Sequence, residues 1–310
     1  MTRTDVAQPV PVRPVAAPAR PPAAASVAGP SPAGDAWRPG RLVLPLTTAA
    51  ALVLAWHLAV RLTYGGPFTG AGDVLRAAAN PGNNDLFPTP WEVVRAVYEL
   101  AEKGVLLNYI VSSLFRVTIG FVLAVLVGVP FGLLLGWFAP LARAFNPVIQ
   151  VLRPISPIAW IPIAILWFGV DDRSPVFLIF LASVFPITVT AMAAVQNIQP
   201  VYVRAARNFG VGRLTLFRRV ILPATLPQIL TGIRITLGVA WLVVVAAEMV
   251  AVNPRSGGLG YLIIDARNAG KRYDLVVAGM MMIGLIGLFL DVLVRQLEKH
   301  DEVRWGYASR

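Results

Sequence analysis

The chain has 310 residues, of which 56% are hydrophobic and 14% are charged. A soluble domain of this length buries less apolar material than that, so the composition indicates an integral membrane protein. The sequence has no cysteine and only two histidines, which excludes a disulfide framework and leaves almost no material for histidine-based metal or triad chemistry. The net charge of +11 does not indicate nucleic-acid binding, because the basic residues lie in loops between apolar runs.

Residues 1–41 are rich in proline and alanine without apolar periodicity, which predicts a disordered cytoplasmic tail. The apolar run at 42–62 is long enough for a first transmembrane helix. The polar segment 63–104 is predicted to lie outside the membrane. Within it Thr89-Pro90-Trp91-Glu92 has the pattern of a capping box, and the amphipathic helix that follows is expected to lie flat on the outer membrane surface.

The second predicted span, 105–138, carries Arg116 and then a series of glycines. Glycines four residues apart on one helix let a neighbouring helix approach closely, so we expect this face to pack against another span. The glycines are Gly120, Gly128, Gly132 and Gly136.

The segment 144–168 contains four prolines, which predicts a broken helix. Broken backbone at membrane depth is tolerated only against protein or a water-filled cavity, so Arg153, Ser156 and Trp160 are candidate lining residues for an anion path. The alternative is that Arg153 reaches the cytoplasmic headgroups and the prolines only shape packing. The next helix is expected to start with Ser174 as N-cap and to run to about Gln196.

The predicted fifth span, 225–252, has Arg234 near its start and Glu248 near its far end. Arg116 enters from the same side as Glu248, and an isolated charge at that depth is expensive, so we expect these two residues to pair across helices. The glycine-rich start of the loop 253–273 is interpreted as a turn at the membrane edge. The sixth span is predicted at 275–293, and a cytoplasmic tail at 298–310.

The stretch 201–227 is polar and basic between two apolar segments, with five arginines that cannot lie in hydrocarbon. It predicts a cytoplasmic loop with one short helix ending at Gly210 and a second from Arg213 to Ile221, until Pro223 starts a new element. Together the two helices form a projecting knob. Its expected contact face for a partner protein consists of Val203, Ala206 and Phe209.

The spacing Ala205-Ala206, Gly210, Leu222-Pro223 resembles the "EAA" coupling loop of bacterial ABC-importer permeases, which docks on the ATPase subunit. The leading glutamate of that motif is replaced here by Arg204. Further stretches, SSLFRVTIGF, VLRPISPIAWIPIAILWFG and TGIRITLGVAWLVVVAAEM, resemble permeases for nitrate, sulfonates, taurine and bicarbonate. The resemblance covers about residues 88 to 297.

The resemblance implies an all-α polytopic protein with six transmembrane helices, a five-helix core of the type I importer fold plus one N-terminal helix. It places the permease core at 105–297 and the coupling loop at 201–223. It implies three partners, which are an ATP-binding subunit, an extracytoplasmic solute-binding protein and a second permease copy. The chain itself would be no enzyme and need no cofactor. The implied coupling residues are Ala205, Ala206, Gly210, Leu222 and Pro223.

The expected location is the bacterial inner membrane with both termini in the cytoplasm. This layout puts fifteen Lys and Arg residues in cytoplasmic segments, nine outside and three within spans, a bias of the right sign. The expected cargo is a small anion such as nitrate, bicarbonate, a sulfonate or taurine. The competing interpretation is an ion-driven secondary transporter or a channel without an ATPase, and a membrane enzyme is a third.

Overall fold

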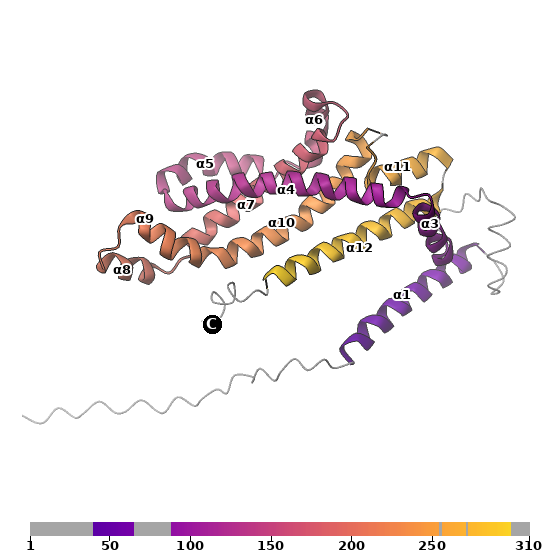
Figure 1. Ribbon diagram of the computed structural model, residues 1–310, viewed down its shortest axis with the longest axis horizontal. Helices are drawn as coiled ribbons and strands as arrows, with labels where there is room; N and C mark the ends of the chain where they lie inside the picture. The colour runs from indigo at the N-terminus through magenta and orange to yellow at the C-terminus, as the bar shows by residue number, and fades with distance from the viewer. Residues whose placement is uncertain (1–39, 65–87, 254–255, 271, 299–310) are drawn as a thin grey trace, which may run out of the picture. The chain divides into compact units, whose positions relative to one another are not determined.

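The computed structural model describes residues 40–64, 88–253, 256–270 and 272–298, and all regular structure in these residues is helical (Figure 1). The predicted tails 1–41 and 298–310 therefore lie almost wholly outside the described residues, as does much of the predicted outer segment. By its internal contacts the chain forms two units, Met1–Leu52 and Val53–Arg310, which are described separately. Helix α1 (Gly40–Tyr64) crosses the boundary between them, and its described apolar part is Pro45–Val60.

Four helices of the second unit are long and apolar enough to cross a membrane. A fifth crossing results if the bent pair described below counts as one span, so the predicted total of six, which includes the shorter apolar run of α1, remains a prediction. Helix α7 packs against both α4 and α10. The four helices are α4 (Val105–Trp137), α7 (Arg173–Gln196), α10 (Leu222–Ala251) and α12 (Tyr273–Glu298).

The glycine face of α4 packs on α7, as the sequence predicted. A Cβ atom added to Gly120 would lie 2.7 Å from the carbonyl oxygen of Val176, and one added to Gly136 would lie 2.6 Å from the Cβ of Val195. These contacts advance together along both helices, so α4 and α7 run parallel. Any side chain at these positions would force the two backbones apart.

The proline-rich segment is broken, as predicted. Helix α5 (Ala139–Leu152) is followed by a turn, a 3-10 helix η1 (Pro157–Trp160) and α6 (Ile161–Phe168), and the two halves are bent by 85°. Backbone groups freed at such a break need partners other than lipid.

Helix α3 (Pro90–Glu102) starts with the predicted capping box, in which the Thr89 hydroxyl accepts from the Glu92 N–H and the Glu92 carboxylate accepts from the Thr89 N–H. One part of its apolar face packs on the chain itself. Val93 and Ala96 pack on Ala278 of α12, and Leu100 packs on Leu106 and Leu262. The exposed large side chains are Trp91, Val94 and Tyr98.

Two expectations about helix boundaries are wrong. Helix α7 starts at Arg173 after Asp172, and Ser174 is no N-cap because its hydroxyl donates to the carbonyls of Gly169 and Ala164 inside the fold. The predicted loop 253–273 contains a further helix, α11 (Leu259–Gly270), which packs on α12 and α10. In Figure 1, α3 and α11 lie at one end of the α4–α7–α10 bundle, and the short helices after α7 lie at the other.

Candidate functional site

The basic stretch after α7 forms a compact projection, here called the knob (residues 200–221). Helix α8 (Pro200–Asn208) starts two residues before the predicted Tyr202 and ends before Gly210, whose φ of 71° is left-handed, as expected of a glycine stop. Helix α9 (Arg213–Leu216) then leads through a π-helical turn, η2 (Phe217–Ile221), directly into α10. Residues 213–251 thus form one continuous helix of 39 residues.

The expected break at Pro223 is therefore wrong. The Leu222 N–H donates to the Phe217 carbonyl, five residues back, so the π-helical turn gives way to α-helix just before the proline. Proline has no N–H, and it is tolerated here because the hydrogen-bond pattern of the helix already changes at this point. Leu222 and Pro223 are both exposed.

Two of the three residues of the predicted contact face of the knob pack partly against the chain itself. Val203 and Ala206 pack against the cluster of Leu216 and Ile221, so they hold α8 on the body of its own chain. Phe209 points the other way and is 86% exposed, the highest value among the large hydrophobic residues of the described chain. Ala205 and Gly210 are exposed as well.

The charges of the knob have no opposite charge nearby in the sequence. The sequence has no Asp or Glu between Asp172 and Glu248. In the part of the chain that the structure describes, no ion pair includes any of the five knob arginines. They are all exposed, namely Arg204, Arg207, Arg213, Arg218 and Arg219.

The three candidate path residues lie at the break between α5 and α6. Arg153 follows the last residue of α5, Ser156 precedes η1, and Trp160 ends η1. Arg153 and Ser156 are exposed, whereas Trp160 is partly buried against the core between α4, α7 and α10.

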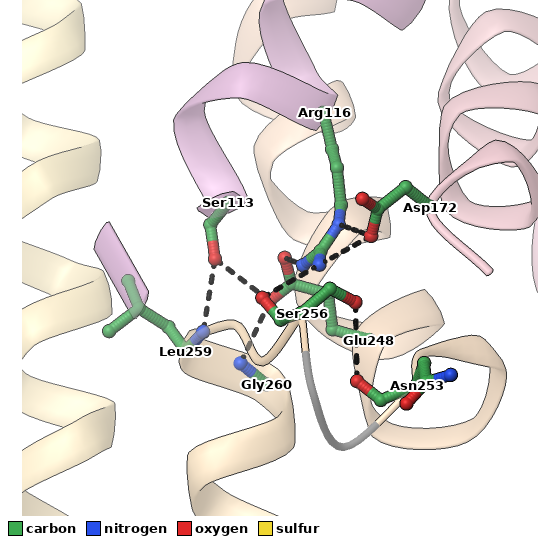
Figure 2. Close-up of polar contacts among 8 residues, drawn as sticks. All are labelled: Ser113, Arg116, Asp172, Glu248, Asn253, Ser256, Leu259 and Gly260. Carbon is green, nitrogen blue, oxygen red and sulfur yellow. Dashed lines mark hydrogen bonds and ion pairs between the residues drawn. The ribbon is translucent and has the colours of Figure 1, made fainter. Parts of the chain in front are cut away.

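At the end of α10 that lies away from the knob there is a buried polar cluster, here called the junction (Figure 2). The structure brings Arg116 of α4 and Glu248 of α10 together as expected, with Nη1 2.5 Å from Oε1 and both side chains almost completely buried. Isolated, either charge would be strongly destabilising at this depth. The pair therefore allows both charges to remain inside the helix bundle.

The junction also contains groups that the sequence did not indicate. The second Glu248 oxygen accepts from the Ser113 hydroxyl at 2.9 Å and from the Gly260 N–H at 3.0 Å, and Ser113 in turn accepts from the Leu259 N–H. Gly258 is required here, because a Cβ at this position would lie 2.5 Å from a Glu248 oxygen and its φ of 148° favours glycine. The glycine-rich turn of the sequence is thus the cradle of a buried carboxylate.

The remaining donors of Arg116 point to the turn before α7 and to the start of α11. Nε and Nη2 bind one oxygen of Asp172 at 3.1 and 2.7 Å, and Nη2 also reaches the Ser256 carbonyl at 3.3 Å. Asp172 is 41% exposed. One guanidinium therefore joins α4, α7, α10 and the segment before α11, which is a structural rather than a catalytic arrangement.

Residues 128–300, more than half of the chain, match the family of the binding-protein-dependent transport system inner membrane component. The chain belongs to this family of ABC-transporter permeases. It is a multi-pass inner-membrane permease, and the family expected from the sequence is confirmed.

Two curated relatives and one solved structure illustrate the similarity. The taurine transport system permease protein of Escherichia coli is 34% identical over 70% of this chain and 81% of its own length. A nitrate import permease protein of Leptolyngbya laminosa is 38% identical over 60% of this chain and 65% of its own length. The structure is a bacterial alginate ABC transporter in complex with an alginate pentasaccharide-bound periplasmic protein, with a TM-score of 0.51 and 16% identity over 62% of this chain and 78% of the other, and it supports the fold.

The permease has a second ion pair toward the other end of α10. Arg234 binds Asp291 of α12 through Nε at 3.1 Å and Nη2 at 2.9 Å, and Arg295 binds the other Asp291 oxygen. Sequence reasoning placed Arg234 within a span but did not pair it. The signal was available, because Asp291 lies in the predicted sixth span and a charge in an apolar helix needs a partner.

A third group of charges attaches α3 of the permease to the start of α12. Arg272 lies 2.9 Å from Glu99 and 2.7 Å from Asp274. The hydrogen bond from Arg272, with that from Lys103, lowers the pKa of Glu99 to about 2. Arg272 is one of the nine basic residues that the predicted layout places outside, and its role here is structural.

Proposed function

We propose that this permease is the membrane-spanning subunit of an ATP-driven importer and that the knob couples it to a separate ATP-hydrolysing subunit. The family and the relatives named above support the importer class. The observation that carries the coupling proposal is the knob itself, whose exposed basic surface lacks any carboxylate of its own chain within 24 residues on either side. Such a surface is suited to a partner protein.

The continuous helix from the knob to the junction provides the mechanical path. A helix of 39 residues is about 58 Å long, so a displacement at Arg213 is carried along one rigid element to Glu248. When ATP draws the ATPase subunits together, the knob would move with them. The helices would then rock between inward-open and outward-open arrangements around the solute path.

We place the solute path at the break between α5 and α6. The solute would be a small anion, such as nitrate, bicarbonate, a sulfonate or taurine. Arg153, exposed at the break, would supply a fixed positive charge, with Ser156 as a hydrogen-bond donor and Trp160 as a wall. Replacing Arg153 by Gln should reduce anion uptake, and replacing it by Lys should retain most of it.

The complete importer would contain two copies of this chain, two ATPase subunits and an extracytoplasmic binding protein that delivers the solute. In this arrangement the knob and both termini face the cytoplasm, and the junction, α3 and α11 face the outside. A reporter that works only in the cytoplasm should therefore be active when it is fused to either terminus, and a reporter that works only outside should be inactive.

The direct test is reconstitution. The chain is purified with a copurifying ATPase subunit, placed in liposomes with the binding protein, and assayed for uptake of labelled nitrate, bicarbonate, taurine and an alkyl sulfonate. We expect uptake of one of these only when ATP is present. Uptake that follows an ion gradient without ATP would instead establish a secondary transporter or channel.

A further inference from the structure

Helix α3 has a second apolar face that the described chain leaves exposed. Its inner face, which consists of Val93, Ala96 and Leu100, packs on α12, α4 and α11. On the opposite side of the helix Trp91 and Tyr98 lie two turns apart, and they are 60% and 68% exposed. The helix is therefore apolar on two sides, of which the chain covers one.

The contacts of α3 place it across the ends of two spans. Its first half packs on Ala278, the sixth residue of α12, and its second half packs on Leu106, the second residue of α4. Its Glu99 binds Arg272 just before α12 starts, and such charges mark the edge of the hydrocarbon. Ala278 lies about 6 Å along α12 from Asp274, and the headgroup layer is about 5–8 Å thick. Helix α3 therefore lies where headgroups meet acyl chains.

The exposed face of α3 has the residue types of a membrane–water interface. Tryptophan and tyrosine combine an apolar ring with a polar group, and they are enriched at the level of the headgroups. Arg95 lies one turn after Trp91 on the same side and is exposed. Among the described residues no carboxylate forms an ion pair with Arg95. Two rings and a cation without a counter-charge suit a phospholipid, whose phosphate a guanidinium can bind at two points.

The start of α4 favours lipid over a soluble partner protein as the occupant. Leu107, Val111 and Phe115 follow α3 closely in the chain, are spaced four residues apart, and are 70%, 62% and 58% exposed. They form an uncharged stripe on one face of a helix long enough to cross the membrane. Residues typical of the headgroup level on α3 are thus followed by residues suited to acyl chains on α4.

We propose that Trp91, Val94, Arg95 and Tyr98 form a binding site for a phospholipid headgroup, here called the lipid face of α3. The Arg95 guanidinium binds the phosphate, and the two aromatic rings lie at the boundary between headgroups and acyl chains. Since α3 also packs on α4 and α12, a bound lipid holds the ends of both spans at a fixed depth. The inference depends on neither the solute nor the ATPase subunit.

A spin label measures the depth of the lipid face, because the chain has no cysteine of its own. The Val94→Cys variant is labelled with a nitroxide in nanodiscs of phosphatidylethanolamine and phosphatidylglycerol. Its collisions with oxygen, which concentrates in hydrocarbon, are compared with those with a water-soluble nickel chelate. The controls are Leu126→Cys within α4 and Phe209→Cys on the knob, because both side chains are exposed.

The label at position 94 should give an oxygen-to-nickel ratio between those of the two controls. A ratio equal to that at position 209 would place α3 in water and overturn the proposal. Protection from both reagents would show that protein, such as a second copy of the chain, covers this face, and it would overturn the proposal as well.

Native mass spectrometry tests the role of Arg95 by measuring how firmly the full-length permease retains phosphatidylglycerol. Arg95→Gln should weaken retention about fivefold, and Arg95→Lys should retain the lipid nearly as well as the unaltered permease. The matched control is Glu102→Gln, an exposed charge on the same helix, which should not weaken retention. Equal retention by Arg95→Gln and the unaltered permease would overturn the headgroup site. A failure of ATP-driven uptake would leave both measurements unchanged.

Discussion

The junction and the knob lie toward opposite ends of the helix that runs from Arg213 to Ala251, and they differ in how their charges are neutralised. At the junction one buried arginine donates to two carboxylates and a backbone carbonyl, and the buried carboxylate of Glu248 also accepts from the Gly260 N–H, all within the same chain. In the knob five exposed arginines have no carboxylate nearby in the sequence. The first region is neutralised within the fold, whereas the second leaves its charges exposed.

The junction therefore holds several helix ends together, whereas the knob can be displaced relative to the rest of the chain. A buried ion pair in which both carboxylate oxygens accept hydrogen bonds resists separation, so the ends of α4, α10 and α11 at the junction should move as one body. A projection held by a small apolar cluster can be displaced by whatever binds it. The predictions below test the two regions in turn.

The largest effect is expected from breaking the buried pair. Arg116→Met leaves Glu248 without its cation, which should lower the free energy of unfolding by about 3–5 kcal/mol. The double variant Arg116→Met with Glu248→Leu should recover much of this loss, because no unpaired charge stays buried. Thermal unfolding in detergent measures both. Equal stability of Arg116→Met and the unaltered permease would show that the pair does not fix the junction.

The glycine cradle comes next. Gly258→Ala places a Cβ against Glu248 in a backbone conformation that alanine disfavours, so we expect a loss of about 1–3 kcal/mol. The control is Gly238→Ala on α10, where an added Cβ meets no atom within 4 Å. If both variants unfold at the same temperature, the cradle is not sterically constrained.

The two alanines of the knob should separate packing from docking. Ala206→Asp puts a charge against the Leu216 cluster, so it should lower stability by about 1–2 kcal/mol. Ala205 lies on the exposed side of α8, so Ala205→Asp should leave stability unchanged and reduce ATPase binding and uptake. Unfolding and uptake measured on both variants check this. Full uptake by Ala205→Asp at normal expression would show that Ala205 does not contact the ATPase subunit.

A smaller effect is expected at the exposed edge of the junction. Asp172→Asn removes one carboxylate but leaves the Arg116–Glu248 pair intact, and Asp172 is 41% exposed. We expect a loss of about 1 kcal/mol or less. A loss as large as that of Arg116→Met would mean that Asp172, rather than Glu248, is the main partner of the arginine.

The smallest effect concerns pH at α3. Because the pKa of Glu99 is lowered from 4.5 to about 2, its contribution to stability is fully present above pH 4.5 and is lost as the pH falls toward 2. The groups around it are Arg272, Lys103 and Asp274. Hydrogen exchange of α3 should therefore rise more between pH 4.5 and 3 in the unaltered permease than in Glu99→Gln. The same rise in both would exclude this pair as the cause.

Much of the fold could be predicted, because the relevant signals are local in the sequence. The glycine series predicted that α4 packs closely on another span, the prolines predicted the broken segment, and a depth count along two apolar helices was enough to pair Arg116 with Glu248. Each depends on spacing within one helix or on the cost of a lone charge in hydrocarbon.

The parts that could not be predicted depend on which surface the rest of the chain covers. In the sequence Ser113 looks like an ordinary span residue and Gly260 like an ordinary loop residue. Only the fold shows that both donate hydrogen bonds to Glu248. Helix α11 is short and follows glycines, so its sequence is typical of a turn. In the knob, helical spacing grouped Val203, Ala206 and Phe209, but only tertiary contacts show that the first two face inward.

The most direct test of the contrast between the two regions uses the absence of cysteine in the chain. Single cysteines are introduced at Phe209 on the knob and at Leu107 near the start of α4, and the rate of maleimide labelling is measured in nanodiscs with and without the ATPase subunit. We predict that the subunit strongly slows labelling at position 209 and leaves the rate at position 107 unchanged. Equal labelling of position 209 in both conditions, with the subunit demonstrably bound, would contradict the assignment of the knob as the site of coupling.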